Sequence, residues 1–197
     1  MDMVTDCKRE RILTAALEIF STQGFANTTV QEIAAKAKVG KGTVYTYFAT
    51  KEDVLIDLLD EGLAHMGKHI EERIKLLTDS GMKLRAILRE QLRYFHNNRP
   101  LMRLLSREAW GQELGSSSIA HRIRSSYIKM LQEVIDKGIE AGELRALDSE
   151  TVATALYGMV SLVALYAKDI TCEAKLEHVE MTLQELFFQG VALSPAF

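Results

Sequence analysis

Cysteine and proline are both scarce in this chain of 197 residues, which has two of each. Cys7 and Cys172 are far apart, and neither belongs to a Cys-x-x-Cys pair, so no disulfide framework or zinc knuckle is expected. Proline occurs only at Pro100 and Pro195, and beyond residue 51 no segment alternates apolar and polar residues as a half-buried strand does. The composition therefore indicates an all-α protein.

Long apolar runs are missing as well. The strongest covers residues 152–167, which is 16 residues, fewer than the ~20 that a bilayer-spanning helix needs, and it includes Thr154 and Ser161. The first residues, MDMVTDCKRERI, carry acidic groups and lack the apolar stretch of a secretory signal. We therefore expect a soluble, cytoplasmic protein.

Motifs for catalysis and cofactor binding are also absent. The chain has no Gly-x-Ser-x-Gly, His-Glu-x-x-His, P-loop or dinucleotide-binding glycine pattern, and Gly40 and Gly42 follow no strand. Glu71 and Glu72 would point in different directions on a helix, which suits a solvated surface better than a catalytic pair. We expect neither an enzyme nor a bound cofactor.

His65 and His69 are four residues apart, a spacing that can place two imidazoles on one metal ion. A complete site would need further ligands, such as His96 or an acidic residue, and the sequence does not bring these to the pair. Because such pairs are common by chance, we predict no metal site, with metal sensing as the weaker alternative.

What the chain does contain is a helix-turn-helix pattern in residues 28–51, TTVQEIAAKAKVGKGTVYTYFATK. Thr29 and Glu32 have the spacing of a capping box, so a helix is expected to begin near Thr29. Residues 38–40 interrupt its apolar pattern and predict a turn, in which Gly40 either adopts a positive φ or caps the next helix.

The second helix of this pattern has two different faces. Val44 and Phe48 are four residues apart and are expected to pack inward, which leaves mainly polar and aromatic side chains facing outward. A helix of this kind can enter the major groove of duplex DNA. Charge agrees with this position: residues 1–51 hold seven Lys and Arg against five Asp and Glu, a net +2, while the remainder holds 17 against 22, a net −5.

These residues resemble the DNA-binding signature of the TetR/AcrR family of bacterial transcriptional regulators. The similarity includes Arg11, Ile12 and Phe20 upstream, a Gly24-Phe25 turn, and Lys51 to Asp53 downstream, so it covers about the first quarter of the chain. One departure is Gly40, where the family often has serine, and this predicts a helix cap weaker by a few tenths of a kcal/mol.

The resemblance implies which side chains contact DNA. The family's DNA-facing positions on the second helix correspond to Lys41, Thr43, Tyr45, Thr46 and Tyr47, and its flanking contacts to Thr29, Gln31 and Lys51. Lysine and the hydroxyls can donate to phosphates, Lys41, Gln31 and Thr46 can reach base edges, and the tyrosine rings can contact thymine methyls. For each tyrosine the alternative is ordinary packing with a solvated hydroxyl.

The remaining sequence predicts further helices. They are expected from Thr50 to Leu77, from Gly81 to Asn97, from Pro100 to Trp110, from Ile119 to Ala141 with Gly142 as the stop, and in two final segments, with a loop at 111–118. We therefore predict a three-helix helix-turn-helix DNA-binding domain at 1–51 and a helical ligand-binding and dimerisation domain at 52–197.

The last two segments are rich in apolar residues. Between 152 and 167 these residues surround most of the helix, and 179–193 supplies another apolar surface, which fits either a homodimer or the core of a monomer. The resemblance favours the dimer, because the family pairs its last two long helices in a four-helix bundle. Two DNA-binding heads about 34 Å apart, or a multiple of that distance, would bind a pseudo-palindromic operator.

The resemblance also implies a small-molecule effector that releases the protein, a repressor, from DNA. Flexible methionines and aromatic residues suit an apolar or amphipathic ligand, although plain core is the commoner role for each candidate: Met66, Ile70, Met102, Leu105, Trp110, Tyr127 and Met130. Arg103, Arg107 and Arg122 either bind an anionic group, such as a carboxylate or a coenzyme A phosphate, or are simply solvated. The alternative function is a constitutive helical, architectural DNA-binding protein without ligand control.

Overall fold

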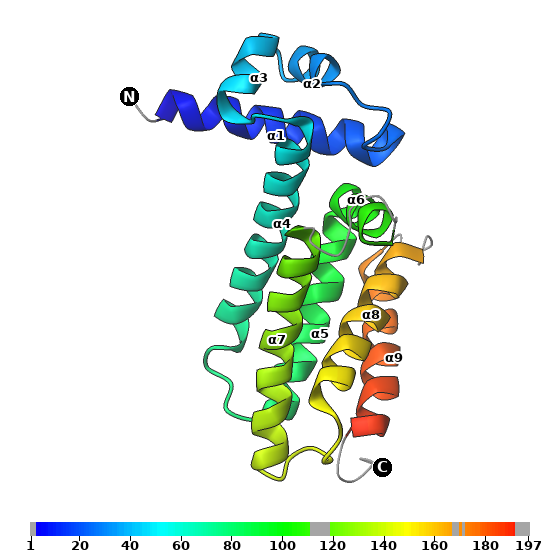
Figure 1. Cartoon of the computed structure of the whole chain (residues 1–197). Helices are drawn as coiled ribbons and strands as arrows, with labels where there is room; N and C mark the ends of the chain where they lie inside the picture. The colour runs from blue at the N-terminus through cyan, green and yellow to red at the C-terminus, as the bar shows by residue number, and fades with distance from the viewer. Residues whose placement is uncertain (1–2, 111–118, 167–169, 171, 192–197) are drawn as a thin grey trace. The chain divides into compact units, whose positions relative to one another are not determined.

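The computed structural model describes residues 3–110, 119–166, 170 and 172–191, with only the helical backbone of 3–6, 106–110 and 119–125. In these residues every element of regular secondary structure longer than one residue is an α-helix (Figure 1), which confirms the expected all-α class. The loop expected at 111–118 lies outside the described residues. The helices are α1 Met3–Gln23, α2 Val30–Lys36, α3 Lys41–Tyr47, α4 Lys51–Ile74, α5 Ser80–Asn97, α6 Arg99–Trp110, α7 Ile119–Glu140, α8 Ser149–Tyr166 and α9 Glu173–Val191.

The chain divides into two compact units. The head unit comprises Met1–Leu63 and Pro100–His121, and the body unit comprises Ala64–Arg99 and Arg122–Phe197. Helix α4 therefore begins in the head unit and ends in the body unit. The domain boundary expected after Lys51 falls at the first residue of α4, and it stays a prediction.

Local capping signals position the helix ends. The predicted capping box of Thr29 and Glu32 is confirmed, and a second box joins Thr50 and Asp53, whose backbone N–H groups donate to each other's side-chain oxygens at 2.8 and 3.1 Å. Gly142 has φ +71° just beyond α7, as expected of a helix-ending glycine. These interactions are local in sequence, which is why the sequence predicts them.

In the head unit, α1, α2 and α3 pack against one another (Figure 1). The core of this packing is formed by side chains that are at most 2% exposed: Ile12, Ala16, Phe20, Ile33, Val44 and Phe48. Burial of one such side chain contributes about 1.5–3 kcal/mol, so this small core fixes the position of the short α3 on α1 and α2.

In the body unit, α5 packs against α8 and α9, and α8 packs against α9. The apolar face of α5 is fully buried through Leu84, Ile87, Leu88, Leu92 and Phe95. A polar group lies within this core: the Tyr127 hydroxyl donates to Gln91 Oε1 at 3.1 Å, and Gln91 is itself fully buried. Burial, followed by the neighbouring Tyr157, raises the pKa of Tyr127, so its hydroxyl stays a neutral donor.

Helices α8 and α9 expose apolar side chains. Leu162 and Tyr166 on α8 are 39% and 67% exposed, and Met181 and Leu186 on α9 are 70% and 61% exposed. Helix α8 begins three residues before the apolar run, and its 18 residues make it long and apolar enough to cross a membrane by length and composition alone. Only 22% of these residues are buried in the chain. Core helices of soluble proteins pass the same test. The exposed apolar surface needs a cover, and a second protein chain can provide one.

Candidate nucleic-acid interface

A tight turn joins α2 to α3. The Lys38 N–H donates to Ala35 O at 3.1 Å and the Val39 N–H to Ala34 O at 3.0 Å, the two hydrogen bonds of a Schellman motif. Lys38 has φ +54°, a conformation that costs a non-glycine residue about 1–2 kcal/mol. Of the two alternatives for Gly40, the structure shows the helix cap, with φ −71°, so the positive φ of this turn belongs to Lys38.

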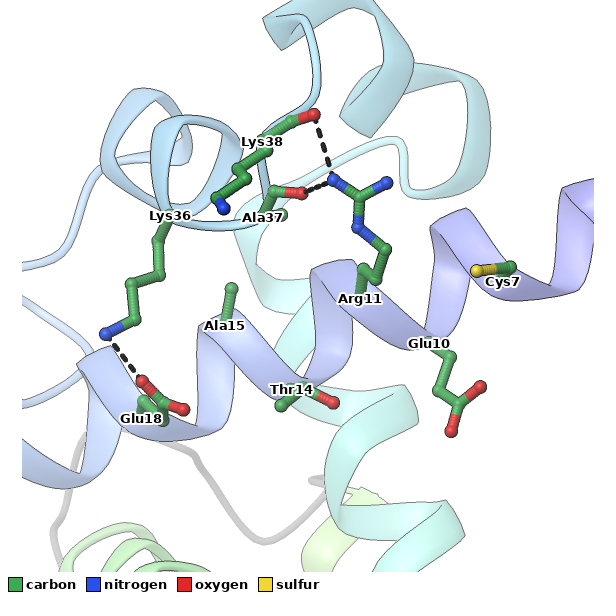
Figure 2. A pocket seen from close by; sticks show the side chains of 9 residues that line it. All are labelled: Cys7, Glu10, Arg11, Thr14, Ala15, Glu18, Lys36, Ala37 and Lys38. Carbon is green, nitrogen blue, oxygen red and sulfur yellow. Dashed lines mark hydrogen bonds and ion pairs between the residues drawn. The ribbon is translucent and has the colours of Figure 1, made fainter.

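Arg11 of α1 holds this turn in place. Its Nη2 donates to Lys38 O at 3.0 Å and also to Ala37 O, two carbonyls beyond the last residue of α2 (Figure 2). Nearby, Lys36 Nζ forms an ion pair with Glu18 Oε2 at 2.6 Å. These side chains line an open groove of about 490 Å³ between α1 and α2. The guanidinium fixes the start of α3 relative to α1, a role that the sequence does not reveal, because its acceptors are main-chain carbonyls 26 and 27 residues away.

The two faces of α3 differ as expected. Val44 and Phe48 are 1% and 2% exposed. Lys41, Tyr45 and Thr46 are exposed, and Thr43 and Tyr47 are half-buried. No side chain caps the helix at Gly40, and the weaker cap expected from the missing serine stays a prediction. The result is a short helix anchored by two apolar side chains that presents a mixed polar and aromatic surface.

Contacts within α3 orient some of these outward side chains. The Thr46 hydroxyl donates to Gly42 O at 3.0 Å, so its oxygen remains available as an acceptor. The Lys41 ammonium lies 5.8 Å from the centre of the Tyr45 ring, one helical turn away. This cation–π geometry holds a positive charge beside an aromatic face on the exposed side of the helix.

The flanking residues are bound within the head. The Thr29 hydroxyl donates to Glu32 Oε2 at 2.8 Å and accepts from the Glu32 N–H at 3.3 Å. The backbone hydrogen bond of Thr29, then its hydroxyl and Gln23, lower the pKa of Glu32. Gln31 is exposed. Thr29 therefore has a confirmed capping role, and any contact of Thr29 or Gln31 with DNA stays a prediction.

Lys51 is also engaged inside the head. Its Nζ donates to Phe25 O and Thr28 O, both at 2.8 Å, and lies 4.3 Å from the centre of the Phe25 ring. The ammonium thus ties the loop between α1 and α2 to the first residue of α4. An ammonium has three N–H donors, so one is left for a phosphate.

The candidate ligand-lining residues are divided between the units. Met66, Ile70 and Tyr127 are buried in the body unit and Met130 is partly exposed there, whereas Met102 and Leu105 are buried in the head unit. The side chain of Trp110 lies outside the described residues. The wall of a ligand site and an ordinary core both require burial, so these residues stay candidates for either role.

Charged side chains on the body unit pair with one another. A surface depression of about 620 Å³ is lined by Arg73, Arg89, Arg93 and acidic residues of α5 and α9. Arg89 Nε lies 2.7 Å from an oxygen of the buried Glu180, and Arg93 Nη2 lies 3.8 Å from the other. The acidic groups offset the arginine charge, so this depression is a poor anion site.

His69 Nε2 lies 2.8 Å from Glu90 Oε2, and the ring of His65 lies 5.8 Å from that of Tyr94. Within the described part of the chain, no three His, Cys, Asp or Glu side chains are grouped to hold a metal ion. The partners of the two histidines both lie on α5 and do not form a shared ligand set.

Two family models match this chain. Residues 12–58 match the model of the bacterial regulatory proteins of the tetR family, and residues 78–165 match a tetracyclin repressor-like C-terminal domain. The first covers most of α1 together with α2, α3 and the start of α4, and the second runs from the start of α5 almost to the end of α8.

Individual proteins are also similar over most of their length. The fatty acid metabolism regulator protein of Bacillus subtilis is 27% identical over 154 residues, 78% of this chain and 79% of that protein. The solved FadR of Bacillus subtilis in complex with stearoyl-CoA has a TM-score of 0.83 and 25% identity, covering 92% of this chain and 98% of that one. The fatty acid degradation regulator FadR of Bacillus halodurans shares the fold, with a TM-score of 0.84, 24% identity and coverage of 93% and 95%.

Proposed function

Because this chain belongs to the TetR family of bacterial transcriptional regulators, we propose that it binds its operator through the exposed face of α3. The protein is a ligand-responsive transcriptional repressor that binds operator DNA as a dimer and is released by a small molecule. The constitutive, ligand-independent alternative is not favoured, because a similar regulator is solved with a bound acyl-CoA.

The main support for the DNA-binding proposal is that one face of α3 is buried while the other is exposed. Val44 and Phe48 are buried, whereas Lys41, Tyr45 and Thr46 are exposed and Thr43 and Tyr47 are half-buried. The proposed contacts are Lys41, Thr43, Tyr45, Thr46 and Tyr47, with Thr29, Gln31 and the free N–H of Lys51 at the edges of the groove. Lys41 and the hydroxyls can bind phosphates, while Lys41, Gln31, Thr46 and the tyrosine rings can contact bases.

The dimer forms through the last two helices, and we place its centre at the exposed apolar residues of α8 and α9. Leu162 and Tyr166 lie four residues apart on α8, and Gly158 lies one turn before them, where an added Cβ would meet no atom within 4 Å apart from its chain neighbours and the backbone of its own turns of helix. A partner helix can approach closely at such a glycine. Burial of the apolar area removes it from water at about 25 cal/mol per Å².

The effector that we propose is a long-chain acyl-CoA. The support is the similarity to a regulator solved with stearoyl-CoA, together with the buried apolar side chains of the body, such as Met66 and Ile70, that would face an acyl chain. The effector must bind the DNA-incompetent conformation more tightly than the DNA-bound one, and a coupling of about 1–3 kcal/mol is enough for useful release. Met66 and Ile70 lie on α4, which begins in the head unit, so a displaced α4 would move the head.

The proposed function includes no catalysis. The relatives are transcriptional regulators, and a protein that binds chromosomal operators acts in the cytoplasm of a bacterium.

A titration separates the two parts of the proposal. An operator duplex is first obtained by repeated selection from a random-sequence library with the unchanged protein, and its binding is then measured at fixed salt for the unchanged protein and for Tyr47→Ala. We expect weaker binding by Tyr47→Ala with the dimer intact, and release of the unchanged protein by stearoyl-CoA but not by coenzyme A or stearate alone. Equal binding by the variant removes Tyr47 from the interface, and a complex that persists with stearoyl-CoA removes the acyl-CoA class.

A further inference from the structure

Arg9 of α1 is bound to the helix that leaves the head. Its Nη2 donates to Asp57 Oδ2 at 2.8 Å, and its Nη1 donates to Glu61 Oε1. Asp57 and Glu61 are one turn apart on the same face of α4, so a single guanidinium spans two carboxylates. All three residues belong to the head unit.

The same guanidinium contacts the end of α3. Its central carbon lies 5.6 Å from the centre of the Phe48 ring, and Phe48 is the C-cap residue of α3 and is 2% exposed. The Phe48 N–H donates to Val44 O at 2.9 Å, which joins the ring to the last turn of that helix. Asp57, Glu61, Arg9 and Phe48 therefore form one continuous set of contacts between α4 and α3.

This ion-pair group is stronger than a single surface salt bridge. The Arg9 side chain is only 30% exposed, and its planar fork uses two separate N–H groups. Burial by itself would lower the pKa of Arg9, but the hydrogen bonds and charges of Asp57 and Glu61 outweigh it and raise that pKa. The guanidinium stays charged, so the contact persists across the physiological range of pH.

We infer that Arg9 is a positioning residue that makes α3 follow the displacement of α4. Lys51 fixes the first residue of α4 to the loop between α1 and α2, and Arg9 fixes α4 again at Asp57, six residues later. With two attachment points, α4 cannot tilt without moving α1, and the ring contact at Phe48 carries this movement to the end of α3. The inference rests on the proposed binding of DNA by α3, and it assigns a regulatory role to a side chain outside the proposed DNA contacts.

Removing the acidic partners of Arg9 gives a test in which the direction of the change in operator affinity is informative. The double variant Asp57→Asn with Glu61→Gln keeps the shapes of both side chains and removes two negative charges from a protein that binds a polyanion. General electrostatics alone would strengthen operator binding. The inference predicts the opposite, a loss of about five- to tenfold in operator affinity, because Arg9 no longer fixes α4 and Phe48.

A second comparison separates positioning from direct contact with DNA. Arg9→Met and Lys8→Met each remove one positive charge from neighbouring positions of α1, and Lys8 is exposed. If Arg9 positions α3, Arg9→Met weakens operator binding more than Lys8→Met does, while the dependence of log affinity on log salt keeps its slope. If Arg9 contacts a phosphate, that slope decreases by about 1. Arg9→Lys, which keeps the charge but loses the fork, should recover only part of the affinity.

The measurement is fluorescence anisotropy of the selected operator duplex with full-length dimers of each variant, after far-ultraviolet circular dichroism has shown native helix content. Tighter binding by the Asp57→Asn, Glu61→Gln variant, or a reduced salt slope for Arg9→Met, overturns the role of Arg9 and leaves DNA binding by α3 standing. A selection that enriches no duplex overturns the proposed DNA-binding function instead, and the role of Arg9 with it.

Discussion

Lys51→Met should destabilise the head, because it removes a partly buried ammonium bound to two carbonyl oxygens. Lys51 Nζ donates to Phe25 O and Thr28 O at 2.8 Å each, and methionine keeps the apolar stem while losing the charge. A hydrogen bond from a charged donor contributes about 1.5–3 kcal/mol. Since Lys51 is partly exposed and water can reach the released carbonyls, we take the lower end, about 2–3 kcal/mol for the pair.

The cation–π contact with Phe25, at 4.3 Å from the ring centre, adds about 0.5–1 kcal/mol. The expected loss is therefore about 3 kcal/mol in the free energy of unfolding, measured by urea denaturation of the full-length protein. Amide hydrogen exchange should also become faster around Thr28, which is 2% exposed and whose hydroxyl donates to Gly24 O at 2.7 Å. Lys41→Met, a change at an exposed lysine, is the matched control and should leave stability nearly unchanged.

One result would refute this reasoning. A salt slope smaller by about 1 would be no refutation, because the proposed phosphate contact of Lys51 predicts it as well. The refuting result is that Lys51→Met retains its stability within about 0.5 kcal/mol. The internal hydrogen bonds would then contribute little to the head.

Three further changes test the fold and the dimer. Gly40→Ser should stabilise the protein by a few tenths of a kcal/mol in urea denaturation, because φ −71° and ψ 148° suit serine and its hydroxyl can cap α3; lower stability would argue against a cap at this position. Gly138→Ala should lower the free energy of unfolding by about 1–3 kcal/mol, because its Cβ would lie 2.6 Å from Leu144 Cδ1 and 2.8 Å from Ser80 Cβ. The control Gly67→Ala, whose Cβ would lie in open space, should be neutral or stabilising. Equal effects of the two changes would contradict this packing. Leu162→Arg should dissociate the dimer into folded monomers in sedimentation experiments, by about 100-fold in the dimer dissociation constant, and an intact dimer would place the interface elsewhere.

The features that the sequence predicted well are those encoded by neighbouring residues. They are the capping box of Thr29 and Glu32, the inward pair Val44 and Phe48, and the stop at Gly142, each of which depends on spacings of three to four residues or on one glycine. The apolar surplus around α8 fitted either a homodimer or the core of a monomer, and the structure shows that Leu162 and Tyr166 of this helix are exposed within the chain.

The features that the sequence could not predict depend on distant or unusual partners. Lys38 adopts the left-handed conformation, although Gly40 two residues later could have taken it, because the Schellman hydrogen bonds and Arg11 fix the turn at Lys38. The acceptors of Lys51 are carbonyls 23 and 26 residues away, and the partners of Arg9 are 48 and 52 residues away. Such contacts have no periodicity, so only the folded chain reveals them.

The ligand candidates show a different limit. Met66, Ile70, Met102 and Leu105 are buried, but a wall of a ligand site and a packed core are both apolar and both exclude water. Sequence pattern and burial therefore agree without distinguishing the two. The acyl-CoA proposal depends instead on similarity to a regulator solved with such a ligand.

The most direct test of the central claim is the specificity of operator binding when only α3 is altered. Anisotropy titrations compare the selected operator with a scrambled duplex of the same length for the unchanged protein and for Tyr45→Ala with Thr46→Ala. Both side chains are exposed, so the fold and the dimer should persist. We predict that the ratio of the two affinities falls by about tenfold or more, because contacts to bases are lost while phosphate contacts remain. An unchanged ratio would contradict the assignment of α3 as the helix that recognises the operator.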